Sequence, residues 1–166
     1  HEAYKEAEKA LQKVLRTYRK AAQKILSTYL NLLTVYPDQP YDQSEVIHPI
    51  EGEVIIKPKD CGDFTRLFPK EETVLDITRR KIANGERVLI YTSWTRTDSQ
   101  KKLLKLLREE GYRTEILTPQ VPTEKREEWV DKRVKNGLQV LITNPRCVET
   151  GLDLNAFTTL IFYSMG

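Results

Sequence analysis

A polar loop between two short apolar runs carries the side chains best suited to chemistry. Residues 143–153 read TNPRCVETGLD and lie between the apolar runs at 140–142 and 159–162. Short apolar runs bounded by polar residues suit strands that are covered on both faces of a parallel sheet, so the pattern predicts strand, loop and strand. In open sheets of this kind, ligands bind at the carboxyl ends of the strands. The loop is therefore the first candidate site.

A second polar segment is expected at the same edge of the sheet. Ser93 to Arg96 follow the apolar segment RVLIYTS at 87–93, which predicts another strand. Hydroxyls, amides and helix N-termini can hold phosphates without reading base sequence. The predicted contacts with a polyanion, such as a nucleic acid, are Ser93, Arg96, Thr143, Asn144 and Arg146.

Two further features near this edge have alternative interpretations. Trp94 is a base-stacking platform in one interpretation and a packed core residue in the favoured one, because indoles are usually largely buried. The helical segment that follows is rich in cations, which are expected on a solvated face, with phosphate contact as the minority interpretation. These cations are Lys101, Lys102, Lys105 and Arg108.

Composition indicates a folded chain with a modest charge. The 166 residues suit one domain with an appendage, and the hydrophobic fraction of 39% beside 31% charged residues excludes a disordered class. No apolar run approaches the ~20 residues of a membrane helix, and no signal-peptide core is visible. The net charge is only +3, so binding of a polyanion has to come from local patches.

The cysteines and histidines predict neither a disulfide framework nor a metal site. Cys61 and Cys147 are far apart and belong to no CxxC pair. His48 has no second histidine to pair with except His1. This usage is typical of a reducing compartment, so a cytoplasmic location is expected.

The first part of the chain predicts a long helix and then an irregular segment. Residues 2–33 carry apolar side chains at alternating spacings of four and three, so domain 1–34 is expected to be one amphipathic helix. It is expected to pack on a neighbouring domain, with a coiled-coil partner as the alternative. Prolines recur through residues 35–69, which predicts an irregular linker or insertion with a strand candidate at 53–57.

From residue 70 onward, helices and strands alternate. Such alternation predicts an α/β fold with a parallel sheet and right-handed crossovers. Asn-Gly or glycine is expected to end each helix in a left-handed conformation, and Thr123 is expected to cap the third helix. The expected elements are helix 70–83, strand 87–93, helix 98–110, strand 114–117, helix 123–137 and strand 138–143. The expected core residues are Leu89, Ile90, Leu141, Ile142, Leu160 and Ile161.

The order of these elements resembles a known family of motor proteins. TNPRCVETGLDL resembles motif V of superfamily 2 helicases and translocases, with Thr143, Gly151, Leu152, Asp153 and Leu154 on the motif positions. The segments RVLIYTSWT, LLKLLREEGYRTEIL and TEKREEWVDKRVKNG precede it in the order found in the second RecA-like domain of Swi/Snf-type translocases. The resemblance covers residues 70–163, and the helix with Tyr36-Pro37 looks like the segment that links the two lobes.

The resemblance implies a RecA-like helicase C-terminal lobe over residues 70–166. It places Gly151 and Asp153 toward the ATP cleft, where Asp153 contacts the ribose or, alternatively, caps a turn. It implies that the full-length protein uses ATP and Mg²⁺ as cofactors. The implied partners are a nucleic acid, with duplex DNA favoured, and the N-terminal RecA-like lobe of the same protein. Many members have glycines where this loop has Glu149-Thr150, which affects the expected nucleic-acid contacts.

Catalysis by these residues alone is not expected. Phosphoryl transfer needs a phosphate-binding loop, a metal and an arginine finger, and none of the three is identifiable in the sequence. The family's motif VI would follow the last strand. No catalytic residue is therefore assigned, and the 166 residues are expected to be inactive on their own.

Two alternatives come from other classes of protein. One is a catalytically inactive α/β module that recruits partners through its long helix. The other is an α/β enzyme that binds a small molecule. Residues 91–97 contain no glycine, which argues against a dinucleotide-binding fingerprint after the first strand.

Overall fold

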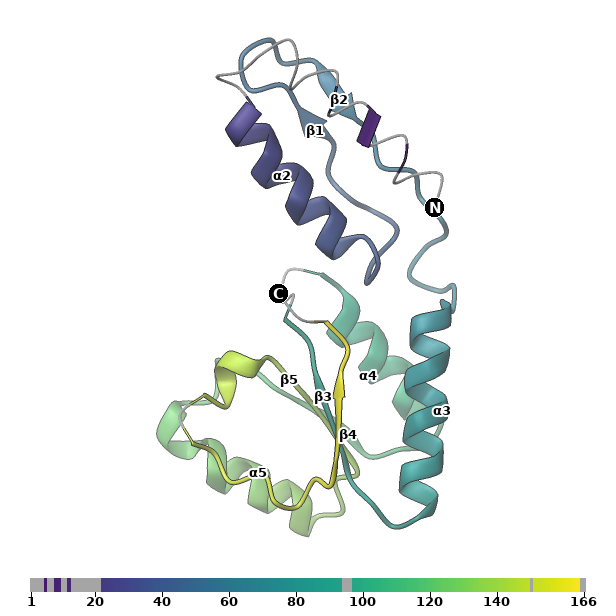
Figure 1. Cartoon of the computed structure of the whole chain (residues 1–166). Helices are drawn as coiled ribbons and strands as arrows, with labels where there is room; N and C mark the ends of the chain where they lie inside the picture. Colours follow the sequence, from purple (N-terminus) through teal and green to yellow (C-terminus); the bar gives the residue numbers. More distant parts are fainter. Residues whose placement is uncertain are drawn as a thin grey trace. The chain divides into compact units, whose positions relative to one another are not determined.

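The computed structural model describes residues 22–93, 97–149 and 151–164, together with Lys5, Glu8, Lys9 and Gln12. The chain divides into two compact units, His1–Arg66 and Leu67–Gly166, and each is described by itself (Figure 1). Among the residues described, no helix combines the length and the apolar character needed to cross a membrane.

The second unit is built on a four-stranded parallel sheet. Its strands are β3 (Val88–Tyr91), β4 (Thr114–Leu117), β5 (Val140–Thr143) and β6 (Thr159–Phe162), in the spatial order β4-β5-β3-β6. β3 pairs in parallel with both β5 and β6. This confirms the predicted α/β class and the parallel pairing of the strands that precede the two polar segments.

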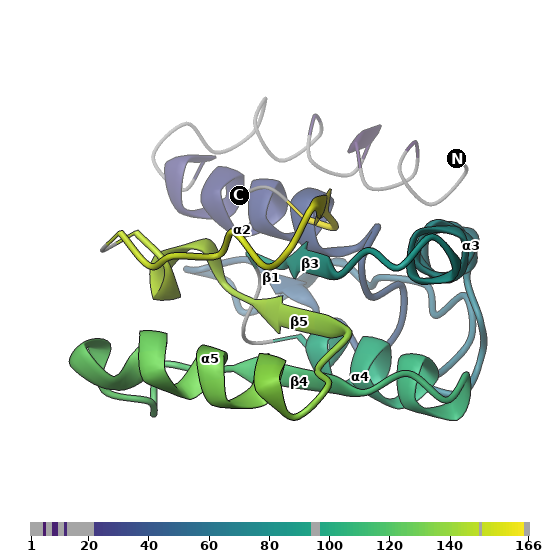
Figure 2. The same cartoon turned by 90° about the horizontal axis from the view of Figure 1, so that it is seen from below.

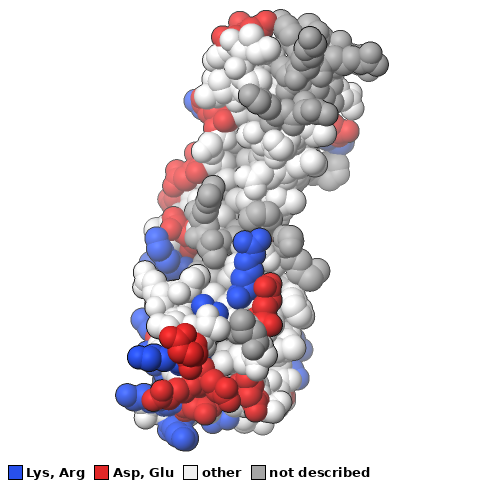
Figure 3. Space-filling model, turned by 90° about the vertical axis from the view of Figure 1, so that its left-hand side faces the viewer, with Lys and Arg blue, Asp and Glu red and all other residues white. Residues whose placement is uncertain are grey.

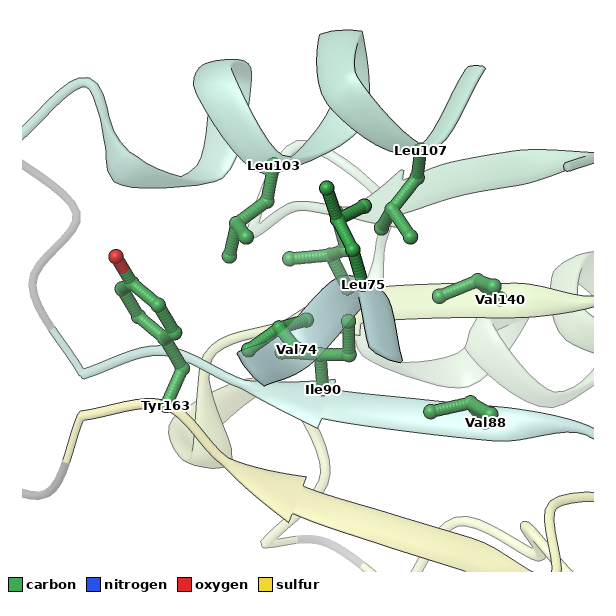
Figure 4. Packing of buried hydrophobic residues seen from close by; sticks show 9 residues of the cluster. Val74, Leu75, Val88, Ile90, Leu103, Leu107, Val140 and Tyr163 are labelled. Carbon is green, nitrogen blue, oxygen red and sulfur yellow. The ribbon is translucent and has the colours of Figure 1, made fainter. Parts of the chain in front are cut away.

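Helices cover both faces of this sheet. α3 (Pro69–Ala83) and α4 (Ser99–Glu109) pack on one face, where Val74, Leu103 and Leu107 meet Val88 and Ile90 of β3 (Figure 4). α5 (Arg126–Lys135) packs on the other face, against Leu89, Leu117 and Leu141. Figure 2 shows α5 and α3 on different sides of β3 and β5.

The expected core is correct for the central strands and wrong for Leu160. Leu89, Ile90, Leu141 and Ile142 are fully buried, whereas Leu160 is 53% exposed and Ile161 is half-buried. β6 is an edge strand that pairs only with β3, and Leu160 points to the face that α5 covers. α5 does not reach over this edge, so Leu160 stays in contact with water.

Glycines end the helices as predicted, but one predicted cap is wrong. Gly85, Gly111 and Gly137 follow α3, α4 and α5 with φ of +77°, +87° and +87°, a conformation that side chains disfavour. Thr123 does not cap α5. It begins a single 3₁₀ turn, η1 (Thr123–Lys125), and α5 starts only at Arg126 without a side-chain cap.

The predicted solvated face of α4 is wrong at Lys102. Lys102 Nζ lies 2.9 Å from Glu71 Oε1, and each side chain is only 2% exposed. Glu71 Oε2 also accepts the Phe68 N–H at 2.9 Å, which closes the first turn of α3. A buried ammonium requires such a partner, so the ion pair joins the start of α3 to α4.

The first unit contains a helix and a small hairpin. The expected helix over residues 1–34 is described from Ala22 onward, where α2 (Ala22–Val35) is helical. Its earlier part lies outside the described residues apart from the helical Lys5, Glu8, Lys9 and Gln12, so a single helix over 1–34 stays a prediction. Within the predicted linker, β1 (Val46–Ile47) and β2 (Val54–Ile56) pair antiparallel. Their buried Val46 and Ile56 pack against α2 residues such as Ile25.

His48 has a structural position in this hairpin. Its ring is buried, and Nδ1 accepts the N–H groups of Ile50 and Glu51 at 3.4 and 3.1 Å. The imidazole therefore holds the turn between β1 and β2.

Candidate nucleic-acid interface

Asn144 joins the two polar segments at the carboxyl edge of the sheet. Its side-chain Nδ2 donates to the carbonyl oxygens of Thr92 and Ser93 at 3.2 and 2.9 Å. Its Oδ1 accepts the N–H of Arg146 at 3.0 Å. Asn144 is 8% exposed, so its amide is used inside the protein. The structure thus brings Ser93 and Arg146 to one edge, as the sequence predicted.

Thr143 is fully buried beside this bridge. Its hydroxyl donates to the Leu117 carbonyl at 3.1 Å, and the Thr92 N–H donates to the Thr143 carbonyl at 3.0 Å. Gln100 Nε2, from the start of α4, donates to the Thr92 hydroxyl at 2.6 Å. The Thr143 side chain therefore links β5 to the end of β4, and its predicted contact with nucleic acid stays a prediction.

Ser93 links β3 to the end of β6. Its N–H donates to Ser164 Oγ at 2.9 Å, and its own hydroxyl donates to the Ser164 carbonyl at 2.9 Å. This pair of bonds fixes the point at which the chain leaves β3. Arg96 lies outside the described residues, as does Trp94, so their predicted roles stay predictions.

Arg146 is presented to solvent by a hydrogen-bonded turn. It is exposed on the single 3₁₀ turn η2 (Pro145–Cys147), whose first N–H groups bond to Asn144. Among the described residues, no carboxylate lies within salt-bridge distance of its guanidinium. Arg146 is therefore a cation on a backbone that is already ordered, which suits contact with a phosphate.

Arg126 supports the same loop through hydrogen bonds, a role that was not predicted from the sequence. The side chain is 8% exposed, with Nε donating to the Val121 carbonyl and Nη1 to the Cys147 carbonyl, both at 3.0 Å. The guanidinium thus ties the start of α5 to η2. Arg126 lies near the start of TEKREEWVDKRVKNG, a segment that was part of the family resemblance, and that was the available signal.

Gly151 and Asp153 form the outer part of the loop. Gly151 has a φ of +83°, with open space where a Cβ would lie. The exposed Asp153 accepts the Asn155 N–H on Oδ1 at 2.9 Å. The turn-capping role is therefore present in the structure, while the predicted contact of both residues with a nucleotide stays a prediction.

Tyr91 lies at the end of β3 next to this edge. Burial raises its pKa, so the hydroxyl stays protonated at neutral pH. Its ring stacks on Phe162 with the ring centroids 5.3 Å apart. The pair adds an apolar surface beside the polar edge, because Phe162 is 57% exposed.

Comparison with known proteins identifies the family. The helicase conserved C-terminal domain matches residues 69–166. The chain is also similar to the chromatin-remodeling ATPase INO80 of Mus musculus, with 28% identity over 125 residues that cover 69% of this chain and 8% of that protein. These matches confirm the resemblance drawn from motif V and the order of elements. The chain belongs to the helicase conserved C-terminal domain family.

Proposed function

We infer that this chain is the second motor lobe of an ATP-dependent helicase or translocase that acts on nucleic acid, with duplex DNA as its substrate. The observation that carries this proposal is the carboxyl edge of the sheet, where Asn144 joins two loops and Arg146 stands exposed. An exposed cation at the carboxyl edge of a sheet can hold a phosphate without reading sequence. Such contact suits a motor that moves along a polyanion.

Surface charge supports a path along the strand ends rather than across α5. The first turns of α5 expose Glu127, Glu128 and Asp131. Figure 3 shows acidic side chains gathered on the lower part of one face, beside basic ones. Carboxylates repel phosphates, so a nucleic acid that contacts Arg146 is steered away from the first turns of α5.

The residues at this edge fit a supporting role toward ATP and Mg²⁺. The second Asp153 oxygen and the open space beside Gly151 leave room for a contact with a ribose or phosphate. A phosphate-binding loop with its lysine is not identifiable in the chain. ATP would supply the free energy for movement, and its phosphates and metal would be held mainly by the N-terminal RecA-like lobe, which is the proposed partner.

We also propose a reducing, cytoplasmic location. Cys61 is exposed and Cys147 is buried, and both are free thiols. An exposed thiol is stable in a reducing compartment, where disulfides are rare. Thiol titration in extracts of the native cells would test this.

Binding of duplex DNA against salt tests the proposed interface. In the full-length protein, Arg146→Ala is expected to reduce the slope of log affinity against log salt by about one unit, equally for different sequences. Arg80→Ala is the matched control, because Arg80 is exposed on α3, which packs on the sheet away from this loop. Unchanged slope and affinity for Arg146→Ala would contradict the proposed contact.

A further inference from the structure

A basic hollow lies at the opposite end of the sheet from Arg146. It has a volume of about 630 Å³ and is bordered by Thr114, the first residue of β4, and by Leu138, which precedes β5. Four cationic side chains line it, together with one carboxylate, Glu115. The cations are Arg108 of α4, Arg113, and Lys132 and Arg133 of α5.

The guanidiniums around the hollow are held by backbone and aromatic groups. Arg108 donates to the Thr114 carbonyl from Nε and Nη2 at 3.1 and 2.9 Å, and Arg113 Nη1 donates to the Asn136 carbonyl at 2.6 Å. Arg133 lies 3.4 Å from the centre of the Trp129 ring. These partners fix position but leave the positive charges in place, because carbonyls and rings carry no net charge. Within the described part of the chain, Arg108 alone of these cations has a carboxylate within salt-bridge distance, with Nη2 3.7 Å from Glu115 Oε2.

Arg133 Nε is a buried donor without an acceptor among the residues described. Buried N–H groups almost always have a partner, and one that lacks it costs free energy. Arg133 also lines the hollow, so an oxyanion bound there would lie next to this guanidinium. The hollow is therefore lined by cations whose charge is not neutralised, and one of these side chains carries an unsatisfied donor.

The helix dipole explains only part of this cluster. Lys132 and Arg133 lie in the last turn of α5, where cations are favoured. Arg113 comes from outside α5, and a Cβ at Gly137 would lie 2.6 Å from its Nη1. The backbone at Gly137 thus leaves space that the Arg113 guanidinium occupies. Cations from α4, from α5 and from the turn before β4 converge on one hollow.

We propose that this hollow binds phosphate groups, either of a free polyphosphate or of a nucleic-acid backbone. Arginine forks match phosphate oxygens and bind them through paired hydrogen bonds. Side chains that are already ordered lose little freedom when they bind. This site is separate from the interface at Arg146, so its test is independent of the proposed motor function.

Titration of the 166-residue chain with tripolyphosphate tests the site. Lys132→Gln and Arg133→Gln are each expected to weaken binding about tenfold or more, since each removes a charge-assisted bond. Lys135→Gln is the matched control, because Lys135 is an exposed cation of the same last turn outside the hollow. The Arg133 Nε–Hε NMR signal, assigned by its loss in Arg133→Gln, is expected to shift during titration. Circular dichroism of each variant checks its fold.

A second titration with a short duplex distinguishes the two sources of phosphate. If Lys132→Gln and Arg133→Gln lose binding of both the duplex and tripolyphosphate, the hollow binds the phosphates of a nucleic-acid backbone. If they lose binding of tripolyphosphate alone, the hollow binds a free polyphosphate. Either result supports the proposal. Equal weakening by Lys135→Gln, or an Arg133 Nε–Hε signal that does not shift, would overturn it. Loss of duplex binding in Arg146→Ala with tripolyphosphate binding intact would separate the two sites.

Discussion

Replacing Lys102 by methionine is expected to destabilise the lobe by about 3–5 kcal/mol, because the change leaves a buried carboxylate without its partner. Lys102 Nζ lies 2.9 Å from Glu71 Oε1, and both side chains are 2% exposed. Methionine keeps most of the aliphatic stem, so little packing is lost. A domain of this size is stable by about 5–15 kcal/mol, so the loss is a large fraction of the total.

The pair can be separated from the other role of Glu71 by a double-mutant cycle. Glu71 Oε2 accepts the Phe68 N–H at 2.9 Å, and a glutamine keeps an oxygen that can accept this bond. Glu71→Gln alone strands the Lys102 ammonium, whereas the double variant removes both charges. The double variant is expected to be less destabilised than the sum of the single ones, with a coupling of about 2 kcal/mol or more.

Urea unfolding followed by circular dichroism measures these differences. Lys101→Met is the matched control, because Lys101 pairs with Asp98 at 3.2 Å while its side chain is 77% exposed. Such surface pairs contribute about 0.2–1 kcal/mol. A loss for Lys102→Met no larger than that for Lys101→Met would refute a buried, stabilising contact between α3 and α4.

Three further outcomes are expected. Gly151→Ala should destabilise the lobe by about 1 kcal/mol, because φ is +83° although the space around it is open; equal urea midpoints would contradict this. Hydrogen bonds from Thr159 and Lys81 hold the pKa of Glu86 below its ordinary value of 4.5. Wild type should therefore exceed Glu86→Gln in stability above that pH and lose the advantage as pH falls through the lowered pKa, and a difference that does not change with pH would argue against it. The purified 166 residues should show no measurable ATPase activity in a phosphate-release assay, and turnover that is lost in Asp153→Ala would show that the assignment of the catalytic groups is incorrect.

Sequence patterns predicted those features of the fold that depend on neighbouring residues in the chain. Short apolar runs located β3, β4 and β5, and glycines located the ends of three helices, because both depend on backbone conformation and nearby residues. The sequence also predicted that Ser93 and Arg146 lie at the same edge of the sheet, since the carboxyl ends of parallel strands meet at one edge. Residues 35–69 were harder, because the short strands β1 and β2 are stabilised by packing on α2.

The sequence alone thus determined the parallel α/β class, the family and the position of the candidate interface, because these depend on periodicity and on the order of short motifs. Only the tertiary structure decided which side chains of that edge face inward. Thr143 bonds to Leu117, Arg126 bonds to Cys147 and Lys102 pairs with Glu71, each with a partner at least 21 residues away. Leu160 is exposed because its strand is at the edge of the sheet, beyond the reach of α5. Burial depends on which elements become neighbours in space, and this information is not contained in any local stretch of the chain.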